Sequence, residues 1–334
     1  VWTMAEANDL TVGRVISQER GAYTVACDAG ERIAEISGKY RHELRSASEL
    51  PTVGDFVKFD PGDGSGRAVI KELLPRKSVF LRKAAGTVVT EQPVAANIDT
   101  IFICTSLNED LNLRRLERYL SAAWESGATP VILLTKADLC ADISAAEARV
   151  ADIAPGVDIL VTSSLETDGV EAVRPYLTQG KTVTFVGSSG VGKSTLTNRL
   201  LGEERIKTGG IRGDGRGRHT TTHRELMQLP CGAFVIDTPG MREFGLWDAA
   251  EGIEKTFSDI EVLARSCRFS DCSHTSEPGC AVRAALADGS LSEDRLDSYL
   301  RLNAENTYTK NKAGFLAAKE RKFKEISKIN KHSR

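Results

Sequence analysis

The sequence predicts a chain of three parts: a small N-terminal β-barrel, a central α/β domain and a C-terminal α-helical module. Short alternating apolar and polar segments fill residues 10–81, and apolar strands then alternate with amphipathic helices as far as residue 237. After residue 244 the strand pattern stops and helical periodicity remains. At 334 residues the chain is too long for one ordinary domain, and we expect the domains to span 1–84, 85–245 and 246–334.

The composition is that of an ordinary soluble protein, with 41% hydrophobic and 27% charged residues. No apolar run approaches the ~20 residues needed to span a bilayer. Val1–Leu10 has neither a basic start nor an apolar core, so we expect no signal peptide, no membrane attachment and a cytoplasmic location. The formal net charge is −2, so attraction to nucleic acid must come from local basic patches.

The first part is predicted to be an OB-like barrel of five short strands separated by Gly, Asp and Pro turns. Such barrels commonly present a strand face to oligonucleotides. A barrel that serves only as a packing module stays open as the alternative, because a fold does not fix a function. The following stretch, Leu81–Ala96, is expected to be a linker because it contains Gly86 and Pro93. The expected strands are Gly13–Ile16, Tyr23–Cys27, Arg32–Ile36, Asp55–Phe59 and Arg67–Ile70.

The central part has the spacing of βαβ units, with amphipathic helices such as Leu113–Ser126 between most of the strands. Buried strands of this kind form a parallel sheet that is covered by helices on both faces. The expected strands are Thr100–Thr105, Pro130–Thr135, Asp158–Thr162, Thr182–Val186 and Phe234–Ile236.

A phosphate-binding loop is the strongest chemical signal in the sequence. It lies directly after the strand that ends at Val186 and directly before the helical run Thr195–Leu201. Glycines let backbone N–H groups converge on a phosphate, Lys193 reaches the outer phosphates, and Ser194 ligates Mg²⁺. The expected nucleotide contacts are Gly187, Ser188, Ser189, Gly190, Val191, Gly192, Lys193, Ser194 and Thr195.

A base-reading element is expected to select guanine over adenine. Thr135, Lys136 and Asp138 follow an apolar strand. The Asp138 carboxylate can accept from the N1–H and N2–H₂ groups of guanine, a pair that adenine lacks, while the Lys136 stem packs along the base. Ser163 and Ser164 follow the next strand and resemble the third base-contacting loop of GTPases. These residues predict GTP as the nucleotide.

Two further segments are predicted to sense the γ-phosphate. Asp237 follows an apolar strand and can hold the Mg²⁺ shell through water, and the Gly240 N–H can meet the γ-phosphate. The Gly- and Arg-rich loop Gly209–His223 contains Thr220, Thr221 and Thr222, one of which is expected to ligate Mg²⁺. A basic loop that contacts only phosphate backbones is an alternative that can hold at the same time.

A cluster of cysteines near the C-terminus predicts one structural zinc ion. Three thiolates and one imidazole within so short a span satisfy tetrahedral Zn²⁺ and leave no open position for catalysis. Unliganded buried cysteines are the alternative. The expected ligands are Cys267, Cys272, His274 and Cys280.

The C-terminal run 310–334 has a large excess of Lys and Arg. Together with the Arg-rich loop and the barrel, this run would make a discontinuous basic surface suited to RNA phosphates. A solvated face or a disordered tail remains the alternative.

Along the chain, the base-reading loops come first, the phosphate loop follows, and the two segments predicted to sense the γ-phosphate, here called the switch segments, come last. This order is circularly permuted relative to that of most GTPases. With Ala95–Asp99, Gly217–Thr221 and the cysteine cluster, this order resembles the RsgA/YjeQ family of bacterial GTPases that mature the small ribosomal subunit. The resemblance covers nearly the whole chain and implies GTP with Mg²⁺, a small-subunit partner with its 16S rRNA, and Thr221 as the Mg²⁺ ligand. Thr135 stands where most GTPases have Asn.

Catalysis is expected to depend on the loop before the second switch. Met241 follows Gly240 where Ras-like enzymes have a glutamine that orients water, so intrinsic hydrolysis should be slow. The resemblance and the chemistry nominate His219 as the group that orients water, with a purely loop-ordering role as its alternative. We expect a monomer that binds the small subunit with GTP and leaves after hydrolysis. The alternative function is an RNA-binding structural module whose nucleotide site does not turn over.

Overall fold

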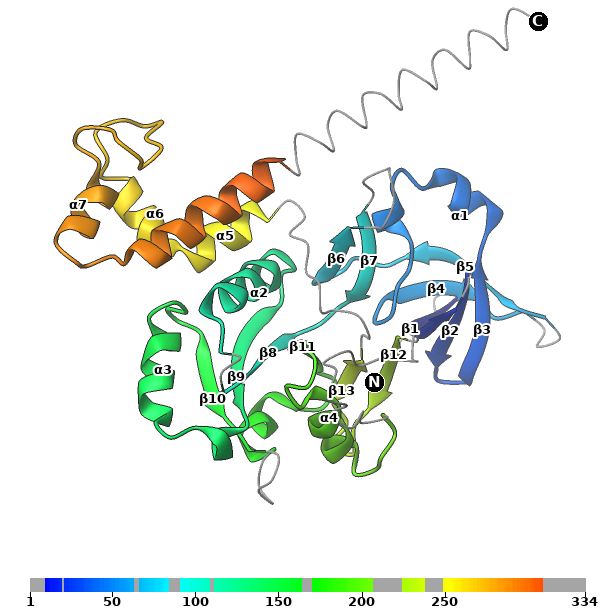
Figure 1. Ribbon diagram of the computed structural model, residues 1–334. Helices are drawn as coiled ribbons and strands as arrows, with labels where there is room; N and C mark the ends of the chain where they lie inside the picture. The colour runs from blue at the N-terminus through cyan, green and yellow to red at the C-terminus, as the bar shows by residue number, and fades with distance from the viewer. Residues whose placement is uncertain are drawn as a thin grey trace, which may run out of the picture.

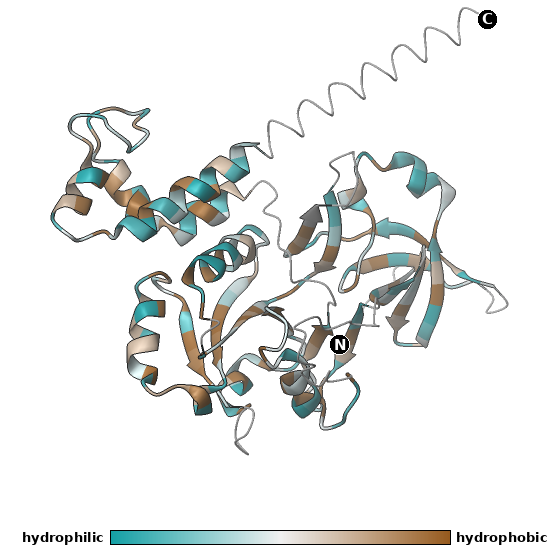
Figure 2. Ribbon diagram, in the orientation of Figure 1, coloured by the Kyte–Doolittle hydropathy of each residue, from teal (hydrophilic) through white to brown (hydrophobic). Residues whose placement is uncertain are grey.

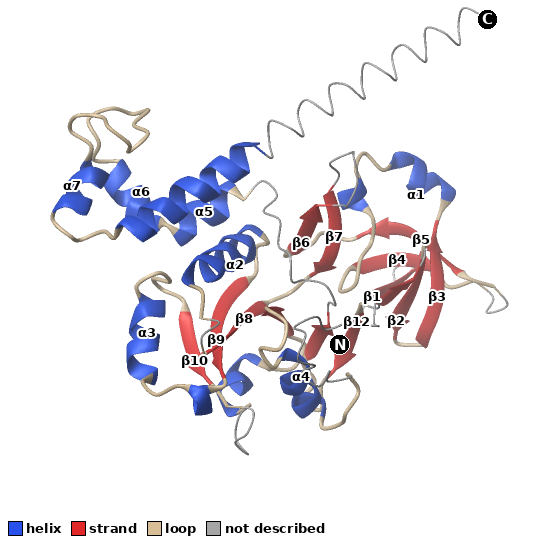
Figure 3. Cartoon of the chain, in the orientation of Figure 1, coloured by secondary structure: helices blue, strands red, loops and turns tan. Residues whose placement is uncertain are grey.

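The computed structural model describes residues 10–19, 21–62, 66–83, 91–108, 111–163, 170–206, 224–237 and 249–308. Figure 1 shows three parts: a barrel, a central sheet flanked by helices, and a helical module. Strands dominate the barrel, the central part combines strands with helices, and the third part is helical (Figure 3). This agrees with the three-part fold class that the sequence predicts. No helix within these residues is long and apolar enough to cross a membrane.

The barrel contains all five of the expected strands. It closes in the order β1-β2-β3-β5-β4, with β4 pairing back onto β1, and β3 runs parallel to β5. Side chains that alternate inward, among them Val15, Val25 and Phe59, form its core. Between β3 and β4 lie the short helix α1 (Gly38–Glu43) and a 3-10 turn. The strands are β1 (Thr11–Glu19), β2 (Ala22–Cys27), β3 (Gly30–Ile36), β4 (Phe56–Asp60) and β5 (Ala68–Leu73).

The expectation of a linker over Leu81–Ala96 is wrong for the described residues. Strands β6 (Val79–Lys83) and β7 (Glu91–Ala96) pair as an antiparallel hairpin. Pro93 is tolerated because the sheet has only two strands and its register shifts nearby. Phe80 and Val94 pack into the core of the central domain, so the hairpin belongs to that core.

The central sheet has the expected parallel strands in the order β10-β9-β8-β11-β13. An antiparallel strand that the sequence pattern does not predict, β12 (Glu225–Gln228), pairs with β13 and makes the sheet mixed. A four-residue strand is too short to show a clear alternation. The parallel strands are β8 (Thr100–Ser106), β9 (Thr129–Thr135), β10 (Asp158–Val161), β11 (Thr182–Gly187) and β13 (Phe234–Asp237).

Both faces of this sheet are buried, as predicted. Along β8, Ile101 and Ile103 enter one apolar core, while Phe102 and Cys104 enter the other. Apolar residues, drawn in brown, accordingly make up much of these strands (Figure 2). The first core also holds residues of α2 (Leu113–Glu125) and α3 (Ile143–Ala151), and the second holds residues of α4 (Lys193–Leu201) and a 3-10 helix, Glu171–Tyr176.

The barrel and the central sheet are joined edge to edge, because β1 pairs with β12 at Ser17 and Glu225. Arg14 of β1 is 2% exposed and donates to the Gly54 carbonyl at 3.1 Å and to Thr182 Oγ1 of β11 at 2.7 Å. Burial lowers the pKa of Arg14 to about 10, against the opposing effect of nearby carboxylates. A buried arginine that donates to both Gly54 and Thr182 therefore links the barrel to the central sheet.

The C-terminal module, residues 249–308, is helical as predicted. It contains α5 (Ala250–Thr256), α6 (Ser258–Ala264), α7 (Ala281–Ala287) and a helix that runs from 293 to the last described residue. Its apolar core includes Ile253, Phe257, Ile260, Val282 and Leu296.

Helix α5 of the module packs on α2 of the central domain (Figure 1). A Cβ at Gly252 would lie 1.9 Å from the Ser121 carbonyl oxygen, so only glycine permits this approach of the two backbones. The Gly252 N–H donates to Glu125 Oε2 at 3.0 Å. The helix-weakening glycine in α5 is therefore explained by the contact with α2.

A buried ionic cluster completes this interface. Arg295 of the module donates to Glu117 Oε1 of α2 at 2.6 Å and to Asp259 Oδ1 at 2.8 Å. Its guanidinium also donates to the carbonyls of Thr256, at 2.7 Å, and Ile153, at 3.2 Å. The Arg295 and Glu117 side chains are 5% and 3% exposed. The buried Arg295 guanidinium thus bonds two carboxylates and two carbonyls, and of the two carboxylates only that of Asp259 is partly exposed.

Candidate nucleotide site and metal site

The predicted phosphate loop connects β11 to α4 at the carboxyl edge of the sheet. Gly187 has φ 137° and a Cβ there would lie 2.2 Å from the Cys104 carbonyl oxygen of β8. Gly190 and Gly192 have φ values of 78° and 99°. These left-handed conformations favour glycine and are of the kind that bring successive N–H groups together in anion-binding loops. Strand order reverses on either side of β8 and β11, which places the loop at a topological switch point.

Lys193 is folded over this loop. Its Nζ donates to the carbonyl oxygens of Gly187 at 2.8 Å and Ser188 at 2.6 Å. Ser194 and Thr195 occupy the first turn of α4 and are half-buried, while Val191 is buried in the core. The lysine therefore lies where it can reach bound phosphates, and the hydroxyls lie at a helix N-terminus that favours negative charge.

Thr135 ties the base-reading strand to the phosphate loop. Its hydroxyl donates to the Val191 carbonyl at 2.8 Å and lies 3.3 Å from the Thr105 carbonyl. The residue is 4% exposed at the end of β9. The structure thus places the Thr135 side chain against the phosphate loop, where it fixes the spacing between that loop and the residues that follow β9.

The two predicted base-reading loops meet in space. Ser163 Oγ donates to Asp138 Oδ1 at 2.5 Å, and the Ala137 N–H donates to the Thr162 carbonyl at 3.3 Å. Lys136 adopts a left-handed conformation with φ 57°, which turns the chain sharply after β9. The Asp138 carboxylate is exposed and oriented by Ser163, so it can accept from a planar donor pair.

Asp237 ends β13, the strand next to β11. Burial raises the pKa of its carboxyl, and the nearby Lys193 ammonium opposes that rise. Lys193 thus donates hydrogen bonds to the phosphate loop and also acts to lower the pKa of the carboxyl that is predicted to hold the Mg²⁺ shell. Several predicted site residues lie outside the described part of the chain: Ser164, His219, Thr221, Gly240, Met241 and the basic run 310–334.

One contact to the phosphate loop was not anticipated from the sequence. Arg115, in the first turn of α2, donates through Nη1 to the Ser188 hydroxyl. No motif marks this arginine, because α2 is an amphipathic helix with several charged residues. Only the packing of α2 beside β8 brings Arg115 to the loop.

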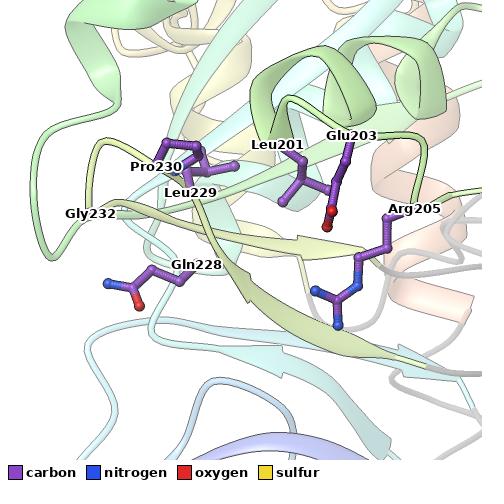
Figure 4. Close-up of a pocket in the computed structure, with 7 residues that line it drawn as sticks. All are labelled: Leu201, Glu203, Arg205, Gln228, Leu229, Pro230 and Gly232. Atoms are coloured by element: carbon purple, nitrogen blue, oxygen red, sulfur yellow. The ribbon is translucent and has the colours of Figure 1, made fainter.

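A surface pocket lies elsewhere, near the amino ends of the parallel strands of the central sheet. It forms where α4 ends and where β12 turns into β13, which is the edge of the sheet opposite the phosphate loop (Figure 4). It is therefore separate from the predicted nucleotide site. The lining residues are Leu201, Glu203, Arg205, Gln228, Leu229, Pro230 and Gly232.

The four predicted zinc ligands converge in the C-terminal module. The side-chain ligand atoms of Cys267, Cys272, His274 and Cys280 all lie within 4.8 Å of one another. Cys280 caps the N-terminus of α7, where its Sγ accepts from the Arg283 N–H at 3.4 Å. The loop that brings the ligands together is closed by a backbone hydrogen bond from Arg268 to Gly279 at 3.1 Å.

The spacing of three of these four atoms fits tetrahedral zinc. Cys267 Sγ lies 3.8 Å from Cys280 Sγ, and His274 Nδ1 lies 3.7 Å and 3.5 Å from these two sulfurs. A tetrahedron with Zn–S bonds of about 2.3 Å and Zn–N bonds of about 2.0–2.1 Å requires separations of about 3.8 Å and 3.6 Å. The cluster can therefore hold one metal ion with His274 coordinating through Nδ1.

Comparison with known proteins agrees with this architecture. A sequence profile of the RsgA GTPase family matches residues 73–247. The chain is 50% identical over 307 residues to the small ribosomal subunit biogenesis GTPase RsgA 2 of Lactiplantibacillus plantarum, which covers 91% of this chain and 86% of that protein. It is 46% identical over 318 residues to the small ribosomal subunit biogenesis GTPase RsgA of Methanosarcina acetivorans, covering 94% of this chain and 85% of that protein.

Two solved structures are similar over most of the chain. The crystal structure of YjeQ from Thermotoga maritima has a TM-score of 0.65 at 26% identity and covers 89% of this chain and 98% of that chain. The structure of YloQ, described as a circularly permuted GTPase, has a TM-score of 0.63 at 25% identity and covers 91% of this chain and 98% of that chain.

Proposed function

The chain belongs to the RsgA GTPase family and hydrolyses GTP, and we propose that it does so on the small ribosomal subunit, whose late maturation it assists. One observation supports the nucleotide chemistry: the phosphate loop and both base-reading loops meet at one edge of the sheet, joined by Thr135 to Val191 and by Ser163 to Asp138. The names of its relatives support the small subunit as the partner.

Each predicted group has a proposed role in this reaction. Lys193 neutralises the outer phosphates, Asp138 reads guanine, and Asp237 orders the water shell of Mg²⁺. Ser194 and Thr221 ligate Mg²⁺ directly. Zn²⁺ supplies folding free energy to the module, because the three thiolates and the imidazole leave no open coordination position for chemistry. We propose domain boundaries near residues 84 and 245.

We further propose that hydrolysis drives release from the subunit. The segment after Asp237 leads directly into α5 of the C-terminal module, which begins at Ala250. Loss of the γ-phosphate would therefore act on a segment that is joined to the module by few residues of sequence. The barrel, the Gly209–His223 loop and the basic run 310–334 are proposed to contact 16S rRNA, with the protein acting as a monomer.

His219 is proposed to orient the attacking water once the subunit orders its loop. A positioned water-orienting group contributes about 10²- to 10⁴-fold, so His219→Ala should lose most of the subunit-stimulated rate while GTP binding stays close to that of the parent. If the variant and the parent hydrolyse GTP equally fast on the subunit, His219 only orders the loop.

A sedimentation and turnover experiment tests the proposed function. Purified small subunits are mixed with the protein and GTP, GDP or a non-hydrolysable GTP analogue, and both co-sedimentation and phosphate release are measured. We expect retention with the analogue, release with GDP, and phosphate release that rises on adding subunits. Equal retention with all nucleotides and no stimulated turnover would favour the alternative, an RNA-binding module whose nucleotide site does not turn over.

A further inference from the structure

Two cations converge on one residue of the phosphate loop. Arg115 Nη1 donates to the Ser188 hydroxyl, and Lys193 Nζ donates to the Ser188 carbonyl at 2.6 Å. The backbone of Arg115 is fixed at the start of α2, because its backbone N–H donates to Oδ1 of the capping residue Asn112 at 3.0 Å. The lysine belongs to the phosphate-loop motif, whereas the arginine comes from a helix that precedes the loop by some seventy residues.

Helix α2 is anchored on its other side by the C-terminal module. Residues i and i+2 of an α-helix are about 200° apart around its axis. Arg115 and Glu117 therefore face nearly opposite directions. Glu117 accepts from Arg295 at 2.6 Å, and Ser121 packs against Gly252 of α5. The helix is therefore held between the phosphate loop and the module, and its first turn has a fixed position.

We propose that Arg115 is a positioning residue for nucleotide binding: it fixes the Ser188 side chain, and so the first turn of the phosphate loop, from a helix that the C-terminal module holds in place. The inference rests on the proposed nucleotide site. A loop that is already ordered loses less conformational freedom when phosphate binds, so the contact strengthens binding of GTP and GDP alike.

The test is equilibrium binding of fluorescent GDP and of a non-hydrolysable GTP analogue to the zinc-loaded full chain. The variants are Arg115→Ala, Arg115→Lys, Ser188→Ala and the double variant Arg115→Ala with Ser188→Ala. Arg114→Ala is the matched control, because Arg114 lies in the same turn of α2 but pairs with the exposed Asp294 of the module. Thermal unfolding of each variant verifies that it is folded.

A charge-assisted hydrogen bond of this kind corresponds to about tenfold in affinity. We expect Arg115→Ala and Ser188→Ala each to weaken both nucleotides about tenfold, the double variant to lose no more than either, and Arg115→Lys to recover part of the loss. Arg114→Ala should bind like the parent. Parent-like affinity of Arg115→Ala, losses that multiply in the double variant, or a lysine variant no better than alanine would each overturn the inference. Failure of the parent to bind either nucleotide would instead count against the proposed function.

Discussion

Replacing Arg295 with Met is expected to weaken the packing of the C-terminal module on α2 by about 3–5 kcal/mol, the usual cost of leaving one partner of a buried ion pair alone. The substitution leaves the Glu117 carboxylate, 3% exposed, without its cation. It also removes the donors to the carbonyls of Thr256 and Ile153. The methionine fills much of the space, so the loss reports electrostatics and hydrogen bonding more than a cavity.

A double variant separates the stranded carboxylate from the lost packing. Arg295→Met combined with Glu117→Gln should lose less than the two single variants together, because the neutral amide no longer needs a cation. Arg301→Met is the matched control: this arginine lies on the same helix and pairs with Asp297 at 3.9 Å, with both side chains mostly exposed. We expect its cost to stay below about 0.5 kcal/mol.

The loss in Arg295→Met should also depend on pH. Burial raises the pKa of Glu117 above its ordinary value of 4.5, and the hydrogen bonds from Ser298 and Arg295 oppose that rise. Without Arg295 the folded-state pKa rises further. A raised folded-state pKa means that stability is retained below the unfolded value and falls as the pH increases through the folded value. The variant should therefore be closer to the parent near pH 5 than at pH 8.

The assay is chemical denaturation of the zinc-loaded chain, with hydrogen exchange of the module's amides to locate the weakened region. A loss below about 1 kcal/mol for Arg295→Met would refute the reasoning, as would strictly additive losses in the double variant. A loss that grows on acidification would contradict the assigned role of the Glu117 carboxylate.

Three other outcomes are expected. Asp138→Asn should weaken GTP and favour xanthosine triphosphate, because xanthine has an acceptor where guanine has its N2 donor; competition binding with an unchanged preference would remove Asp138 from base reading. Lys193→Ala should abolish tight triphosphate binding, since buried phosphate charge loses its partner, and titration calorimetry that finds parent affinity would argue against the phosphate loop. Chelation should unfold the segment around Cys267–Cys280 while the central sheet stays folded, because structural zinc stabilises its own module; zinc-free purified protein of normal thermal stability would exclude that role.

Some features of this protein follow from short stretches of sequence. The Gly187–Ser194 loop needs only contiguous residues between a strand and a helix, and its left-handed glycines follow from their lack of a Cβ. The metal ligands could also be predicted from a short stretch, because all four lie within one Cys- and His-containing span of fourteen residues. The five barrel strands could also be predicted, since alternation with a period of two residues is a local property.

Other features depended on tertiary structure. The sequence predicted a linker where β6 and β7 pair, because Gly86 and Pro93 are local signals for irregular chain while strand pairing depends on a distant partner. It also missed β12, whose four residues carry too little periodicity to distinguish a strand from a loop.

The same limit applies to the contacts that join the site to the rest of the molecule. The Thr135 hydroxyl donates to the Val191 carbonyl of the phosphate loop, a contact that the position of Thr135 in the sequence did not predict. Arg115 meets Ser188, and Arg295 meets Glu117, across 73 and 178 residues of sequence. The sequence by itself determined the chemistry of the phosphate loop and the metal cluster. Tertiary structure alone decided which helix supports them, because that depends on how close two backbones can approach and on which buried charges find partners there.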